Sequence, residues 1–390
     1  MATMTAGELI DDDGASGRGT VVISSPEELI ASLPAMLGFP PGPGSVVVLC
    51  GETADGGQGP VVRMDVDGLP GAGRGDPDDA ELVDGDDGAE LIDGDDGDLA
   101  GAPDPVPGDP AGGRSRPSID PGPARGLAQF CAREGIASVH LVVVHEDCAD
   151  DHLAGLRAED VAAAFEYWLG VVGTEVAAAY GVGEFVEGAP WVDLFGMVRG
   201  VQLDPDSTQI AAVHAYGGRV RADSRDEIDR MYLARDPDAC DLDPHEPGPP
   251  RKYGDRAVAE AVERHDDAAR RWEMGEEVDD DELAGIGRDL LVIAVRDEIY
   301  RRVAVRGLGD VDGRRLLWWA VARRRPGRER SVALLLLGAA AYFAGSGVHA
   351  WSALSAALDA DRGNSLARLL IDSLHAGLSP ERLRRVAAAA

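Results

Sequence analysis

The hydrophobic pattern of the first 235 residues alternates between short apolar runs and amphipathic stretches. Apolar runs rich in β-branched residues predict strands, and apolar positions three and four apart predict helices. The strands predicted in this way are residues 20–24, 45–50, 60–66, 137–144, 174–187 and 189–194. The predicted helices are residues 25–37, 124–134, 159–172, 206–216 and 224–234. This alternation predicts an α/β domain with a central sheet over residues 20–235.

Two of these helices begin with explicit capping signals. Ser25 precedes Glu28 by three residues, and Ser224 precedes Glu227 by three, which is the capping-box spacing. Pro34 lies inside the first helix and lacks a backbone N–H, so we expect that helix to kink or to end early.

The pattern beyond residue 235 predicts helices only. An acidic, proline-rich stretch at 236–252 is interpreted as a linker, and residues 253–390 are interpreted as an all-α domain. Its predicted helices are residues 256–274, 282–305, 311–322, 331–344, 348–359, 365–376 and 380–388. The segment 331–376 is similar to a single tetratricopeptide-like helical hairpin followed by one more helix.

Residues 331–358 carry no formal charge and follow an arginine-rich segment, as a membrane-spanning helix follows a cationic flank. Glycines at 345 and 347 interrupt the stretch after about 13 strongly apolar residues, which is too short for a span of about 20. A helical hairpin buried in a bundle is therefore the predicted structure.

The formal net charge of −33 disfavours binding to nucleic acid or to an anionic membrane surface. Much of this charge is local, because residues 67–120 contain 16 acidic and 3 basic side chains. This stretch includes two tandem nonapeptides, 80–88 and 89–97, whose spacing does not match a calcium-binding EF-hand loop. We interpret residues 67–123 as a disordered acidic insert and residues 1–19 as a disordered N-terminus.

The four cysteines show neither a CxxC motif nor a repeated spacing, so neither a disulfide framework nor a zinc knuckle is indicated. The N-terminus has no cationic start and no apolar core of a secretory signal. Reduced thiols and the missing signal predict a cytoplasmic protein.

The candidate chemical site is an eight-residue stretch directly after the predicted strand 137–144. It contains His145, Asp147, Cys148, Asp150 and His152, whose nitrogen, sulfur and oxygen atoms are ligand types for a divalent metal. His145 and Asp147 are also candidates for general acid–base catalysis. Open α/β sheets bind ligands beyond the carboxyl ends of their strands, which favours this position. The alternative is a solvated loop after the strand, since no ligand spacing is recognisable.

A second cluster is cationic. Seven arginines lie between residues 314 and 330, and Trp318 and Trp319 lie among them. Arginines interleaved with aromatic rings are typical of single-stranded nucleic-acid binding, but the net charge opposes that function. A solvated helix face, or an intramolecular contact with the acidic insert, remains the alternative.

Several segments together resemble a known family. They are residues 25–39, 45–49, 139–147, 350–361 and 364–370, and the resemblance is to the actinobacterial family named domain of unknown function 4192. Members of that family often carry a Cys-Cys-Pro segment after the tryptophan-containing strand, whereas residues 200–205 here read Gly-Val-Gln-Leu-Asp-Pro. The resemblance implies lineage and architecture, and no activity.

No phosphate-binding glycine loop and no GxSxG nucleophile elbow occur in the sequence. The leading hypothesis is therefore an interaction or regulatory module that binds a protein partner through its helical C-terminal domain. The alternative is a metal-assisted enzyme that uses residues 145–152. The sequence indicates no cofactor and leaves the oligomeric state open.

Overall fold

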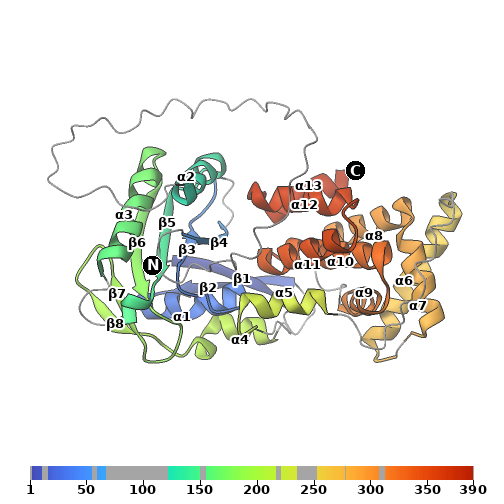
Figure 1. Ribbon diagram of the computed structural model, residues 1–390, viewed down its shortest axis with the longest axis horizontal. Helices are drawn as coiled ribbons and strands as arrows, with labels where there is room; N and C mark the ends of the chain where they lie inside the picture. The colour runs from blue at the N-terminus through green and yellow to red at the C-terminus, as the bar shows by residue number, and fades with distance from the viewer. Residues whose placement is uncertain are drawn as a thin grey trace, which may run out of the picture.

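A computed structural model gives the fold of the chain (Figure 1). It describes residues 2–10, 16–54, 59–66, 122–149, 155–216, 221–234, 253–276, 278–306 and 312–389. Most of the predicted acidic insert 67–123 and the whole of the predicted linker 236–252 therefore lie outside the described residues.

The N-terminal part contains a six-stranded mixed sheet with strand order β4-β3-β5-β6-β7-β8. Its strands are β3 (Ser45–Cys50), β4 (Val61–Asp65), β5 (Ser138–Val144), β6 (Glu175–Val182), β7 (Pro190–Asp193) and β8 (Arg199–Val201). Only β5 and β6 run parallel, and the other neighbours are antiparallel. The chain crosses from β5 to β6 through a helix, as a parallel pair requires. β3 is buried along its whole length, as its continuous apolar run predicts.

Helices cover both faces of this sheet. One face packs against α2 (Gly122–Glu134) and α3 (Gly155–Val171) through side chains such as Val143 and Phe165. The opposite face packs against α1 (Pro26–Leu37) and α4 (Gln209–Tyr216). The predicted α/β class is confirmed.

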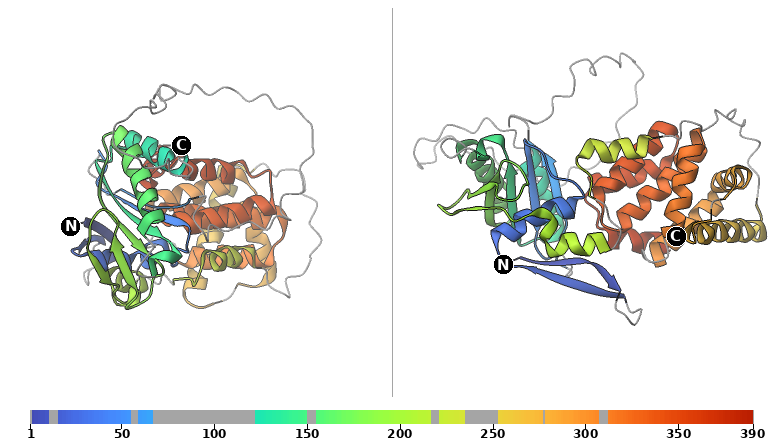
Figure 2. Two further views of the ribbon diagram at one scale, coloured as in Figure 1. Left: turned by 60° about the vertical axis from the view of Figure 1, so that its left-hand side comes forward. Right: turned by 90° about the horizontal axis from the view of Figure 1, so that it is seen from below.

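A separate two-stranded sheet lies beside α4 (Figure 2). It pairs β1 (Ala2–Ile10) with β2 (Ser16–Ile23) in antiparallel fashion. The sequence pattern predicts disorder over residues 1–19, whereas the structure describes two paired strands at residues 2–10 and 16–23.

The C-terminal part is helical, as predicted. Its helices are α6 (Asp255–Glu273), α7 (Asp280–Leu290), α8 (Ile293–Arg306), α9 (Asp312–Arg324), α10 (Gly327–Phe343), α11 (Gly347–Ala360), α12 (Ser365–His375) and α13 (Pro380–Ala389). Among the described residues, no helix is both long and apolar enough to cross a membrane. One continuous hydrophobic core includes the α1 face of the sheet and the interior of these helices. The predicted boundary at 236–252 therefore separates two regions that share a core.

Two local predictions were wrong. The helix that begins after Ser25 does not end early at Pro34: it continues to Leu37, its last residue in the hydropathy pattern, and ends at Gly38, which has a φ of +84°. A proline removes one helical hydrogen bond, and the burial of Pro34 in the core offsets that loss. The single helix expected at 282–305 is two helices, α7 and α8, with a turn at Leu291 and Val292.

Asn364 caps α12 and also anchors α10. Its Oδ1 accepts a hydrogen bond from the backbone N–H of Ala367, and its Nδ2 donates to Ser331 Oγ at 2.9 Å. Asn364→Ala removes the cap and leaves the buried Ser331 hydroxyl with one partner fewer. We expect a loss of about 2 kcal/mol in the free energy of unfolding, measured by urea denaturation.

Ser379→Ala is the matched control, because Ser379 Oγ caps α13 through Arg382 N in an exposed position. It is expected to cost about 1 kcal/mol or less. Equal losses in the two variants would contradict the contribution assigned to the buried Asn364–Ser331 bond.

Candidate functional site

The loop after β5 holds the residues that the sequence singles out. His145 is fully buried, and its backbone N–H donates to Val182 O at 2.8 Å, which ties the loop to the end of β6. Cys148 lies in a short 3-10 turn, η2 (Glu146–Ala149), and its N–H donates to His145 O. Its Sγ lies 2.9 Å from the position that a Cβ on Gly181 would occupy. His145 and Cys148 thus share the carboxyl edge of β5 and β6.

The remaining members of the predicted site are less fully placed. Asp147 lies in η2 without a described side chain, and Asp150 and His152 lie outside the described residues. Within the part of the chain that the structure describes, no group of three histidine, cysteine or acidic side chains could hold a metal ion. A metal-binding or catalytic role for His145, Asp147, Cys148, Asp150 and His152 stays a prediction.

The arginines of the cationic cluster contact groups of the same chain. Four of them form ion pairs within the helical region: Arg314 with Asp266, Arg324 with Asp280, Arg325 with Glu329 and Arg328 with Asp361. Arg330 binds backbone carbonyls. These contacts join α9 and α10 to neighbouring helices, so most of the cluster stabilises the bundle.

A polar network lies at the junction of α6, α8 and α9. Trp318 Nε1 donates to Nε2 of the buried His265 at 2.8 Å, and His265 Nδ1 lies 3.5 Å from Asp266 Oδ1. Burial lowers the pKa of His265, so the ring is neutral near pH 7. Asp266 also accepts hydrogen bonds from Arg302 and Arg314, both at 2.8 Å. With both arginines engaged by Asp266, this network is structural.

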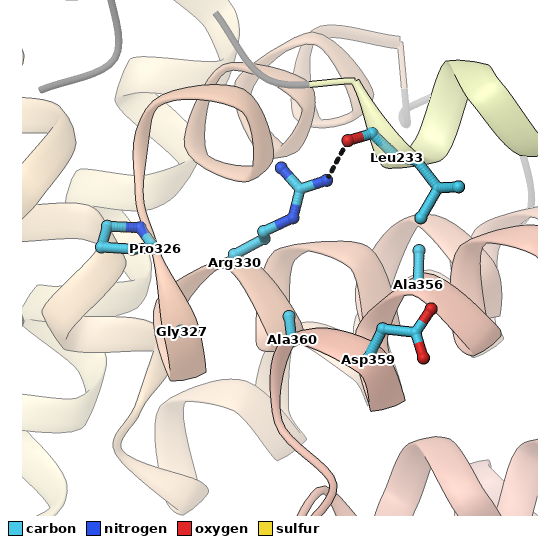
Figure 3. Close-up of a pocket in the computed structure, with 7 residues that line it drawn as sticks. All are labelled: Leu233, Pro326, Gly327, Arg330, Ala356, Asp359 and Ala360. Carbon is cyan, nitrogen blue, oxygen red and sulfur yellow. Dashed lines mark hydrogen bonds between the residues drawn. The ribbon is translucent and has the colours of Figure 1, made fainter. Parts of the chain in front are cut away.

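A hollow of about 280 Å³ lies between the end of α5 (Arg225–Leu233), the start of α10 and the end of α11 (Figure 3). Its lining residues are Leu233, Pro326, Gly327, Arg330, Ala356, Asp359 and Ala360. The Arg330 guanidinium donates to Tyr232 O at 2.8 Å and to Leu233 O at 3.1 Å, which are carbonyls left unpaired at the helix end. Arg330 therefore fastens α5 to the helical region.

Aromatic contacts also attach α5 to the helical region. Tyr232 of α5 stacks on Trp319 with ring centroids 4.9 Å apart, and a 3.1 Å hydrogen bond joins its hydroxyl to His349 Nδ1. Burial raises the pKa of Tyr232 to about 12, so its hydroxyl is protonated near neutral pH. These contacts hold α5 against α9 and α11.

An exposed apolar surface lies at the β8 edge of the sheet and in the turns next to it. Within the described residues, six of 17 exposed large apolar side chains lie between positions 186 and 203. They are Val186, Phe195, Met197, Val198, Val201 and Leu203, which we call the β7–β8 surface. Met197 is 97 % exposed, at the turn between β7 and β8.

Hydrogen bonds hold this turn in place. Asp193 Oδ1 accepts from the N–H groups of Phe195 at 3.0 Å and Gly196 at 3.1 Å. The backbone N–H of Asp193 donates to Val198 O at 2.9 Å. Gly200 lies flat against the buried indole of Trp191, where a Cβ would come within 2.5 Å of Nε1. The turn therefore presents its apolar side chains from an ordered backbone.

This surface was not predicted from the sequence, although the sequence contains a signal for it. The run Phe-Gly-Met-Val at 195–198 follows a strand directly and contains no charged side chain. Turns are ordinarily polar, so an apolar turn indicates an exposed patch.

The fold and these sites define a mixed α/β protein with a helical bundle that shares its core. The chain belongs to the family described as Domain of unknown function (DUF4192), whose model matches residues 26–92 and 108–381. This match confirms the family resemblance seen in the sequence. Neither a curated protein nor a solved structure matches the chain.

Proposed function

We propose that this protein is a protein-binding module whose contact surface is the β7–β8 surface. The observation that carries the proposal is the concentration of exposed apolar side chains on the ordered turn before β8, on the edge strand β8 itself, and directly beside them at Val186 and Leu203. Clusters of exposed apolar side chains are typical of interaction sites, because covering them removes apolar area from water.

The helical region offers a less suitable surface for the same role. Its exposed large apolar side chains are spread over separate elements: Met274 after α6, Ile293 and Val305 on α8, Leu316 on α9, Leu369 on α12 and Val386 on α13. Singly scattered apolar residues are ordinary on protein surfaces. We therefore propose the sheet edge as the contact surface, in place of the helical domain that the sequence favoured.

The test is site-specific photocrosslinking in cells of the source organism. A benzophenone amino acid replaces Met197 in the full chain, and a matched variant carries it at Leu369, which is also exposed. After irradiation we expect a protein adduct of defined mass at position 197 and none at 369, because only the β7–β8 surface is covered by a partner.

Two outcomes would overturn the proposal. One is the absence of an adduct at position 197 although the protein is folded and expressed. The other is the same diffuse set of adducts at both positions, which would indicate random collisions.

The metal-assisted enzyme receives no comparable support from the described residues. The cytoplasmic location stays part of the proposal and is supported by the cysteines. Cys50, Cys131 and Cys148 are the cysteines among the described residues; all three are buried, and they form no disulfide.

A further inference from the structure

The hydrogen-bond register of β7 and β8 determines which backbone groups face outward. Asp193 N donates to Val198 O, and Gln202 N donates to Ala189 O, so residues 198 and 202, on either side of β8, are hydrogen-bonded to residues 193 and 189 of the β7 side. Hydrogen-bonded and non-hydrogen-bonded pairs alternate along an antiparallel ladder. Val201 lies opposite Pro190 in a non-hydrogen-bonded pair, so its N–H and C=O point away from β7. No described strand lies beyond β8 in the sheet. Val201 thus offers a donor and an acceptor to an added strand.

Acidic side chains lie at both ends of this edge. Glu184 and Glu187 are exposed in the turn after β6, and this turn is attached to the end of β8. The attachment consists of hydrogen bonds from Gly188 N to Gln202 O and from Gln202 Nε2 to Glu184 O. Asp193 lies at the other end, where it holds the apolar turn. Residues 184–204 contain four acidic side chains and one arginine.

We infer that the partner is an extended segment of another protein, apolar at alternate positions and flanked by lysine or arginine, which pairs with β8 as a seventh strand. This inference rests on the proposed function. The apolar side chains of the β7–β8 surface would contact the apolar positions, and the acidic ends would attract the basic flanks. A second copy of the chain fits less well, because its own acidic ends would face those of the first copy.

Defined peptides test the inference by fluorescence anisotropy with the full chain. The first peptide alternates valine and threonine between pairs of lysines, and the second replaces the lysines by glutamates. A third is the lysine peptide with N-methylated backbone amides, which cannot form a ladder. We expect the lysine peptide to bind at least about 10-fold more tightly than the other two, and to bind more weakly as salt is raised.

Two variants of the protein locate the contact. Val201→Pro removes the outward N–H without removing a bond to β7, so binding of the lysine peptide is expected to fall by about 10-fold. Glu184→Gln combined with Glu187→Gln leaves the strand edge intact and is expected to reduce the preference for lysine over glutamate flanks. Circular dichroism and thermal unfolding verify that both variants are folded.

The outcomes separate this inference from the proposed function. Equal binding of the lysine and glutamate peptides, or unchanged binding by the N-methylated peptide, would overturn the inference. Sedimentation experiments could also show a dimer of the chain that Val201→Pro abolishes. A second copy would then be the occupant, and this result would overturn the inference as well. In each case an adduct to another protein at position 197 would leave the proposed function standing, whereas a missing adduct would remove both.

Discussion

Asp266→Asn is expected to lower the free energy of unfolding by about 3–5 kcal/mol. The carboxylate binds Arg302 and Arg314, each at 2.8 Å, and Arg314 is buried. The asparagine amide keeps the shape but leaves the Arg314 charge without its counter-ion in a region of low dielectric. Urea denaturation near pH 7 measures the loss.

Asp280→Asn is the matched control. Asp280 forms an ion pair with Arg324 at 3.4 Å, but its side chain is 83 % exposed. Surface ion pairs contribute about 0–1 kcal/mol, so the control is expected to remain in that range. A loss for Asp266→Asn no larger than for Asp280→Asn would contradict the assignment of a stabilising role to the buried network.

The dependence on pH identifies the charge of Asp266 as the cause. Burial alone raises the pKa of Asp266, but the contact with His265 and the charge of Arg314 outweigh it and lower the pKa to about 2. The unfolded pKa is about 3.9. Because the folded pKa is lower, the stabilisation is complete above about pH 4 and is lost as the pH falls toward 2. The difference between wild type and Asp266→Asn is expected to shrink over this window.

Gly313→Ala is expected to destabilise the protein by about 2–3 kcal/mol, although alanine is the better helix former. Gly313 lies in the first turn of α9, where a Cβ would come within 2.2 Å of Ala269 O and 3.0 Å of Glu273 Cβ. The first of these atoms belongs to the backbone of α6, so the two helices must separate. This separation also disturbs Trp318 and His265, which join the same helices. Thermal and urea unfolding measure the effect.

Gly285→Ala is the control for helix propensity. Gly285 lies in the interior of α7, and nothing lies within 4 Å of the Cβ that alanine would add. It is expected to stabilise the protein by about 0.5–1 kcal/mol. The prediction for Gly313 would be wrong if both variants shifted stability in the same direction by the same amount.

Much of the fold could be predicted from local patterns. The capping signals at Ser25 and Ser224 correspond to observed caps, since each hydroxyl accepts the N–H of the glutamate three residues later. The continuous apolar runs of β3 and β5 correspond to central strands of the sheet. The division of 282–305 into α7 and α8 was missed, because neither proline nor a capping residue marks the turn and the neighbouring helices determine it.

The candidate sites were harder to predict. His145 and Cys148 come together at the carboxyl edge of β5 and β6 as the strand position predicts. The arginine cluster suggests a charged surface in the sequence, yet Arg314, Arg325 and Arg330 are buried against partners. Asp266 lies 48 residues from Arg314, and hydropathy contains no information about such a pairing.

The sequence by itself determined the α/β and helical classes, the order of most elements, the family and the local concentration of acidic charge. These properties depend on periodicity, capping and composition, which act over a few residues. The tertiary structure alone decided that the sheet and the helices share one core, that the arginines stabilise the bundle, and that an apolar turn with an outward-facing Val201 lies at the open edge of the sheet. Those outcomes depend on contacts between residues far apart in the chain, which no local pattern specifies.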